Sequence, residues 1–215
     1  MKVLAINGSP KPEGNCSLSL ERIGSVLAKE GIGFEVLNIG GSVIRGCVAC
    51  GQCGKRRDGR CAFDGDAVNK ALPKLGEADG IVLASPVYFS GVAGTMKSFL
   101  DRAFYVASSN GGLFRHKAGA ALVAVRRSGG SSTLDCLTHY LTYSEMLVAT
   151  SNYWAIVHGR APGEAEKDEE GMRTIDQLAE NLAWLMKMRE AARGSTTAPA
   201  AEPAAAVKVL TNFIR

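Results

Sequence analysis

Apolar residues along the chain form short continuous runs, and these alternate with longer segments in which apolar positions recur every three or four residues. A continuous apolar run indicates a strand buried on both faces. The predicted strands are residues 3–6, 34–39, 80–84, 118–125, and either 147–150 or 153–157. A three-to-four-residue spacing predicts amphipathic helices. The predicted helices are residues 17–30, 66–75, 95–105, 133–146 and 169–193.

The alternation of strands and helices predicts an α/β fold, with a doubly wound parallel sheet of five strands and helices on both faces. Residues 1–193 form this domain. The composition then changes: residues 194–206 are rich in Ala and Pro and predict a linker. Residues 207–215 contain apolar positions but are too few for a core. We expect them to form a docking tail, packed on their own domain or on a neighbour.

Composition excludes several classes of protein. With 46% hydrophobic residues in 215, the chain has enough apolar surface for a core. A net charge of +4 is too weak to indicate nucleic-acid binding. The apolar run 118–125 is far shorter than the roughly 20 residues of a membrane-spanning helix, and the run 3–6 is too short for a signal peptide. We therefore expect a cytoplasmic protein in which the six Cys are ligands, redox groups or core residues rather than disulfides.

The segment 7–17 leaves the first predicted strand and enters the first predicted helix. Helix N-termini carry unpaired N–H groups and partial positive charge, and so bind phosphate. The candidate phosphate ligands are Ser9, Lys11, Asn15, Cys16 and Ser17. Neither the dinucleotide fingerprint nor a Walker loop is present. From this loop alone, an ordinary turn capped by Asn15 or Ser17 is an equally good interpretation.

A second loop, residues 85–94, follows the third strand. The adjacent aromatics Tyr88 and Phe89 suit a flat apolar ligand better than they suit a stabilising role. In a sheet of order 2-1-3-4-5, the loops after the first and third strands flank the crevice where ligands bind. The candidate ligand contacts are Pro86, Val87, Tyr88, Phe89 and Gly91. The alternative is that both aromatics pack under the next helix.

A third loop, residues 126–132, follows the fourth strand on the same sheet edge. Arg126, Arg127 and Gly129 are candidate contacts to the polar end of such a ligand. A solvated loop charge is an equally good interpretation of each Arg.

Several segments resemble a known family: 8–11, 14–17, 78–81, 85–89 and 94–102. Across residues 1–184 the chain is similar to the NADPH-dependent FMN reductase and iron–sulfur flavoprotein group of flavodoxin-like proteins. The resemblance implies FMN, with its phosphate on residues 9–17 and its ring against residues 86–89, and an Arg of the third loop stabilising the reduced ring. Cys16 departs from the group, which usually has Thr there, so we expect its contact with the phosphate to come from the backbone N–H. The resemblance also implies NAD(P)H or a small redox protein as electron donor, and a homodimer or homotetramer.

Four cysteines form the pattern C-x2-C-x2-C-x7-C within the segment 46–64: Cys47, Cys50, Cys53 and Cys61. Three thiols spaced by two residues are typical of iron–sulfur cluster ligands. Structural zinc is the second interpretation and a disulfide pair the third. The similar iron–sulfur flavoproteins carry a compact four-Cys run that binds [4Fe–4S], so we expect that cluster here. Cys136 is expected in the core.

The predicted function is electron transfer through FMN and a [4Fe–4S] cluster in a flavin-dependent oxidoreductase. No catalytic side chain is predicted, since no Ser-His-Asp set, carboxylate pair or HExxH motif is evident. One alternative is an NAD(P)H:FMN or quinone reductase without a cluster. The other is a non-enzymatic, zinc-stapled protein that binds a phosphorylated ligand.

Overall fold

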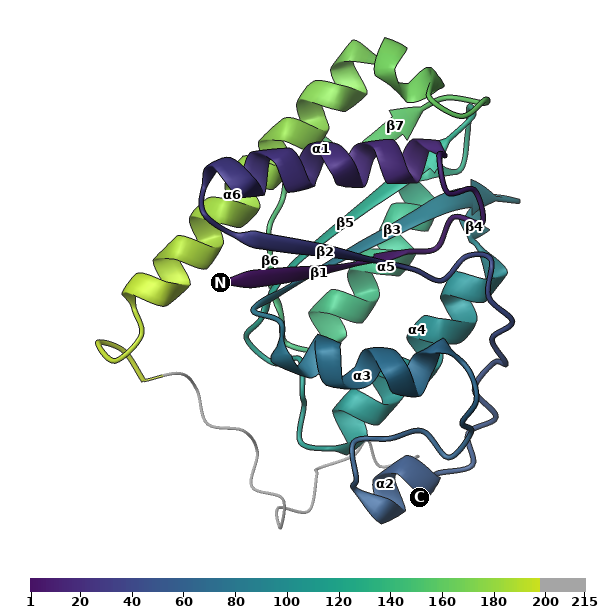
Figure 1. Ribbon diagram of the computed structural model, residues 1–215, viewed down its shortest axis with the longest axis vertical. Coiled ribbons are helices and arrows are strands. Elements are labelled where there is room, and N and C mark those ends of the chain that lie inside the picture. The colour runs from purple at the N-terminus through teal and green to yellow at the C-terminus, as the bar shows by residue number, and fades with distance from the viewer. Residues whose placement is uncertain (198–215) are drawn as a thin grey trace, which may run out of the picture.

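A computed structural model describes residues 1–197 as an α/β domain with helices on both faces of one sheet (Figure 1). The strands are β1 (Lys2–Asn7), β2 (Gly33–Asn38), β3 (Gly80–Tyr88), β4 (Gly91–Val92), β5 (Ala118–Val125), β6 (Leu147–Val148) and β7 (Ile156–His158). The helices are α1 (Asn15–Lys29), α2 (Gln52–Arg56), α3 (Ala67–Glu77), α4 (Gly94–Ser109), α5 (Gly130–Tyr143), the 3-10 helix η1 (Glu164–Lys167) and α6 (Glu169–Ala191). Within residues 1–197, no helix is long and apolar enough to cross a membrane.

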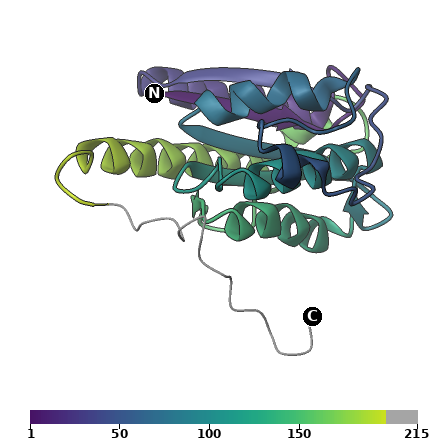
Figure 2. The same ribbon diagram turned by 90° about the horizontal axis from the view of Figure 1, so that it is seen from below.

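The sheet follows the order β2-β1-β3-β5-β6, and these pairings are all parallel. The predicted doubly wound sheet and the order of its main strands are therefore confirmed. Every residue of β5 is buried, as its continuous apolar sequence requires. The connections after β1 and β3 lie on the same side of the molecule, away from the N-terminus (Figure 2).

Two hydrophobic clusters fill the space on either side of the sheet. One contains buried residues of α3, α4 and α5, and the other contains buried residues of α1 and α6. Alternate residues of each central strand belong to opposite clusters: Leu4 and Ile6 face the first, whereas Val3 and Ala5 face the second. The central strands thus hold the loops that follow them on a scaffold that is packed from both sides.

The fifth position in the sheet is shared by two short strands, one from each of the segments 147–150 and 153–157 that the sequence predicted as alternatives. Leu147 of β6 pairs with Ala118 at the start of β5, and Ile156 of β7 pairs with Val123 near its end. The chain leaves the sheet between these two short strands. Both predicted segments therefore contribute a strand to this position, one beside the start of β5 and the other beside its end.

The loop expected after the third strand is a β-hairpin instead. β3 continues to Tyr88 and turns back into the antiparallel strand β4. The Cys segment also holds a short helix, α2, that its lack of periodicity did not predict.

Other boundaries differ less. α1 and α5 begin two to three residues earlier than expected, after Gly14 and Gly129, and α6 ends at Ala191. The predicted linker 194–206 is described only to residue 197, and the predicted tail 207–215 lies outside the described residues.

Candidate functional site

The loop between β1 and α1 is anchored by Asn7, whose side chain is buried at the end of β1. The Asn7 amide nitrogen donates to Ser17 Oγ at 3.0 Å and to Asn38 Oδ1 at 2.9 Å, and its oxygen accepts from the Ser9 backbone N–H at 3.0 Å. Gly40 approaches from the next connection, so closely that a Cβ there would lie 2.1 Å from the Ser9 carbonyl carbon. The loop is therefore held in shape from both sides.

The first turn of α1 suits an anionic ligand. Its N-cap is Gly14, which offers no side chain to the first N–H groups, and no acidic residue lies in the first turn. The capping role considered for Asn15 or Ser17 is therefore not seen. Asn15 Oδ1 instead accepts from the Ala165 N–H at 3.2 Å, which ties η1 to this loop. Uncapped N–H groups at the start of a 15-residue helix, with Lys11 exposed beside them, fit a phosphate group.

Cys16 lies in this turn, but its side chain points into the core. It is 1% exposed and belongs to the cluster between the sheet and helices α1 and α6. Burial raises the pKa of the Cys16 thiol to about 12, and a backbone hydrogen bond with Ala124 offsets only part of that effect. The buried thiol cannot donate to a phosphate. Any contact of Cys16 with a phosphate must therefore come from its backbone N–H, as the sequence led us to expect.

The hairpin after β3 presents the two adjacent aromatics to solvent. Tyr88 pairs with Gly91, and Phe89 and Ser90 form the turn, with φ of +49° and +59°. Two positive φ values are typical of a type I′ turn, where Asn-Gly is usual, so Phe-Ser is a strained choice. Tyr88 is 46% exposed and Phe89 is fully exposed. Packing of these aromatics under the next helix is therefore wrong as an interpretation.

The third loop contacts this hairpin directly. Ser132 Oγ donates to the Ser90 carbonyl at 2.9 Å. A Cβ on Gly129, whose φ is +85°, would lie 2.6 Å from Ser90 Cα, so only glycine permits this approach. Arg126 and Arg127 are exposed, and Arg127 lines a cavity of about 300 Å³ together with Trp154 and His158.

The loop between β1 and α1 meets the same region through α4, which directly follows the hairpin. A Cβ on Gly8 would lie 2.6 Å from Met96 Cβ, and the Gly8 N–H donates to the Ala84 carbonyl at 2.8 Å. Ser85 Oγ accepts from the Ala93 N–H at 3.1 Å, which fixes the start of α4 against β3. The three loops selected from the sequence thus belong to one edge of the sheet.

The four cysteines of the loop 46–64 are free thiols that line one small recess with Arg102 and Tyr105. Cys53 lies on α2 and is buried, Cys61 is partly buried, and Cys47 and Cys50 are exposed. The donors fit a four-Cys cluster in kind and number. In this conformation, however, no three Cys, His, Asp or Glu side chains within residues 1–197 are drawn together as a metal site.

Arg102 is a buried residue of this region that lies in the segment 94–102 of the family resemblance, but it was assigned no role from the sequence. Its guanidinium donates to Cys61 Sγ at 3.2 Å and to the Phe63 carbonyl at 2.7 Å, and it pairs with Asp66. Burial disfavours its charge, but the bonds to Asp66 and Cys61 outweigh that effect, so the pKa of Arg102 is raised. A charged residue in an amphipathic helix is expected to be exposed, so the local pattern gave no sign that Arg102 is buried.

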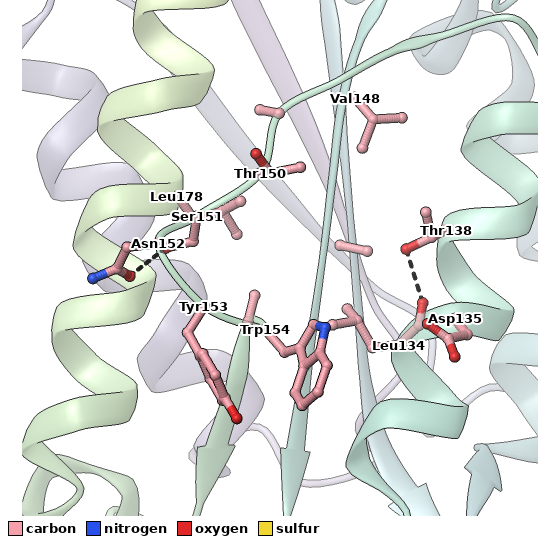
Figure 3. A pocket seen from close by; sticks show the side chains of 13 residues that line it. Leu134, Asp135, Thr138, Val148, Thr150, Ser151, Asn152, Tyr153, Trp154 and Leu178 are labelled. Carbon is pink, nitrogen blue, oxygen red and sulfur yellow. Dashed lines mark hydrogen bonds between the residues drawn. The ribbon is translucent and has the colours of Figure 1, made fainter.

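Another cavity, of about 550 Å³, lies where β6 and β7 part (Figure 3). Tyr153 and Trp154 of the connection lie side by side, with Leu134 and Asp135 of α5 on one side of them and Leu178 of α6 on the other. Trp154 and Trp184 are both more than half exposed. Cys136, expected in the core, is partly exposed.

Comparison with known proteins agrees with this geometry. Residues 1–161 match the model of the NADPH-dependent FMN reductase family. An iron–sulfur flavoprotein of Methanocaldococcus jannaschii is 35% identical over 195 residues, covering 87% of this chain and 98% of that protein. A second, from Methanosarcina thermophila, is 30% identical and covers 87% of this chain and 96% of its own.

Solved structures share the fold. RosB, solved with a bound 8-demethyl-8-formylriboflavin-5′-phosphate intermediate, superimposes with a TM-score of 0.66 at 20% identity, covering 100% of this chain and 94% of RosB. On these matches, the chain belongs to the NADPH-dependent FMN reductase family, in the group of iron–sulfur flavoproteins, and is a flavodoxin-like, flavin-dependent oxidoreductase.

Proposed function

We propose that this flavoprotein transfers electrons between FMN at the sheet edge and a [4Fe–4S] cluster in the cysteine recess. When bound, FMN supplies two-electron chemistry and the cluster one-electron chemistry. The protein contributes binding and orientation. The observation that carries the proposal is the contact between the exposed aromatic hairpin and the Gly129 loop, beside the uncapped start of α1.

The proposed FMN ligands divide by the part of the cofactor they would hold. The phosphate would lie on Ser9, Lys11, Ser17 and the first N–H groups of α1, including that of Cys16. Asn15 has its oxygen engaged with Ala165, so its amide nitrogen is the donor left for the phosphate. The ring would lie against residues 86–91, with Arg126, Arg127 and Gly129 at its polar end.

The cysteine recess is connected to the FMN site by α4. The helix begins beside the hairpin at Gly94, and Arg102, eight residues later, contacts Cys61. At 1.5 Å per residue, about 12 Å of helix separates the two regions. The names of the iron–sulfur flavoprotein relatives support the cluster, and so do the four thiols around one recess.

The decisive experiment is an absorption spectrum of anaerobically purified protein with flavin, iron and sulfide analysis. We expect flavin bands together with a broad iron–sulfur absorbance that bleaches with dithionite, and about four iron and four sulfide per chain. Flavin without iron would favour the cluster-free NAD(P)H:FMN or quinone reductase. Zinc without flavin would favour the non-enzymatic phospholigand binder.

Cys50→Ser tests the ligand set. The variant should lose iron and keep its flavin, because residue 50 lies in the recess and away from the FMN loops. Cys136→Ser is the matched control, since Cys136 lies on α5 outside the recess. Equal iron in wild type and Cys50→Ser would remove Cys50 from the proposed ligands.

The electron donor in this proposal is NAD(P)H or a small redox protein, and the free thiols suit a cytoplasmic, reducing environment. The protein is proposed to be a homodimer or homotetramer in which residues 207–215 dock on a neighbour. A chain ending at Arg193 should then sediment as a smaller species than the full chain. An unchanged oligomeric state would contradict the docking role of the tail.

A further inference from the structure

We propose that Arg102 is a positioning residue that fixes Cys61 as the anchored ligand of the cysteine recess and raises the reduction potential of the cluster held there. This inference rests on the cluster of the proposed function, and it concerns a residue outside the Cys pattern itself. It is carried by one buried guanidinium that contacts both ends of the cysteine segment and one of its thiols.

The Arg102 side chain is completely shielded from solvent. Its Nη1 donates to the Arg45 carbonyl at 3.2 Å, just before Cys47, and its Nη2 donates to the Phe63 carbonyl at 2.7 Å, just after Cys61. Its pairing with Asp66 adds the N-cap residue of α3. One side chain therefore holds the beginning and the end of the cysteine segment against α4.

The fourth contact is to the recess itself. Nε lies 3.2 Å from Cys61 Sγ, which fixes the direction in which this thiol points. Cys47 and Cys50 differ from Cys61, because both are exposed on the irregular part of the segment. We infer that Cys61 is already in its final position and that the exposed thiols close on the cluster around it.

Other basic side chains of the segment do not share this role. Arg56 pairs with Asp58 at 3.2 Å, and Arg60 pairs with Asp64 at 2.9 Å, in both cases at the surface. Exposed pairs are screened by water and salt, whereas a buried charge acts through a medium of low dielectric constant. Arg102 is thus the charge best placed to act on the recess.

Electrostatics gives the direction of the effect. A cluster gains one negative charge on reduction, and N–H groups and cations close to its sulfur ligands stabilise that charge. Arg102 therefore favours the reduced form, while the carboxylate of Asp66 opposes it. Removing the Arg102 charge should therefore lower the reduction potential, and removing the Asp66 charge should raise it. A merely structural role would not produce shifts of opposite sign.

The test is a dithionite titration of the holoprotein. The electron paramagnetic resonance signal of the reduced cluster measures how much of the cluster is reduced at each step. Arg102→Lys keeps the charge and loses the planar fork, whereas Arg102→Gln loses both. Asp66→Asn removes the opposing charge and keeps an N-cap side chain. Lys97→Gln is the matched control, because it removes a charge from the exposed side of the same helix.

We expect Arg102→Gln to lower the ratio of reduced to oxidised cluster at least tenfold at a fixed potential, a shift of about 59 mV for one electron. Arg102→Lys should fall between it and the wild type, Asp66→Asn should shift the other way, and Lys97→Gln should change the ratio less than twofold. Unchanged potentials, shifts of one sign, or loss of iron from all Arg102 and Asp66 variants would overturn the inference. Wild-type protein without iron and sulfide would instead refute the proposed cluster.

Discussion

At the scale of single residues, neighbours in the first turn of α1 have opposite roles. Cys16 and Ser17 are adjacent, yet the Cys16 thiol packs in the core while Ser17 Oγ accepts a hydrogen bond from Asn7 at the end of β1. A helix turns about 100° per residue, so consecutive side chains cannot share a face. Within residues 14–17, which carry part of the family resemblance, the Cys16 side chain is therefore structural, whereas the Ser17 side chain is a proposed ligand.

This division predicts different outcomes for two alanine substitutions. Cys16→Ala should reduce the free energy of unfolding by about 1–2 kcal/mol, because a buried side chain is truncated, and should leave FMN affinity unchanged. Ser17→Ala should weaken FMN binding severalfold with a smaller loss of stability. Urea unfolding and flavin fluorescence titration measure the two effects. Weakened FMN binding by Cys16→Ala would contradict the buried orientation of the thiol.

The raised pKa of Cys16 predicts a pH dependence. In the unfolded chain the thiol ionises near pH 8.5, whereas the folded chain keeps it protonated until about pH 12. Its contribution to stability is thus complete below about pH 8.5 and is lost as the pH rises toward 12. The stability advantage of the wild type over Cys16→Ala should shrink across this range. A constant difference from pH 7 to pH 11 would show that the folded thiol ionises normally.

At the scale of elements, the turn of the β3–β4 hairpin has a strained backbone. Phe89 and Ser90 both have positive φ, at positions where Asn and Gly are favoured. Strain of this kind is typical of sites where ligand contact, rather than stability, selects the residue. Phe89 agrees with that interpretation, because it is exposed at the tip of the hairpin. The hairpin itself contacts the third loop through the hydrogen bond from Ser132 to Ser90.

Replacing the turn by Asn-Gly separates stability from binding. Phe89→Asn with Ser90→Gly should raise the free energy of unfolding by about 1 kcal/mol, because the turn strain is relieved. The same variant should bind FMN more weakly, because an aromatic face is lost. Thermal unfolding of the apoprotein and FMN titration give the two values. A more stable variant with unaltered FMN affinity would exclude Phe89 from the ring site.

At the scale of the whole molecule, the proposed FMN site joins parts that are far apart in sequence. The loops after β1, β3 and β5 meet at one sheet edge, and Asn15 links the first of them to η1. Both hydrophobic clusters pack against the strands that carry these loops. A ligand that bridges the loops should therefore stabilise the domain as a unit.

FMN should raise the thermal stability of the apoprotein measurably. At a free concentration 100 times its Kd, FMN stabilises the folded state by about 2.7 kcal/mol. For a domain of this size, that corresponds to a rise in Tm of about 5–10 °C by calorimetry. Riboflavin is the matched control, since it lacks the phosphate and should raise Tm much less. Equal shifts for FMN and riboflavin would argue against a phosphate site at the start of α1.

The sequence by itself determined the features that depend on local pattern. Continuous apolar runs such as 118–125 predicted the buried strands, because a strand packed on both faces has no polar positions. The strand-to-helix loops and the Cys spacing marked the candidate FMN and cluster regions, because their chemistry depends on residue type and short spacing. The strand order followed from the alternation of elements together with the family resemblance.

Only the tertiary structure decided the features that depend on contacts between distant residues. It turned the expected loop 85–94 into a hairpin, divided the fifth strand between β6 and β7, and directed Cys16 into the core. It also buried Arg102, whose partners Arg45, Cys61 and Asp66 lie 36 to 57 positions away in sequence. Local pattern measures the hydrophobicity of a residue and its neighbours, but a buried charge is stable only with partners that the fold brings to it.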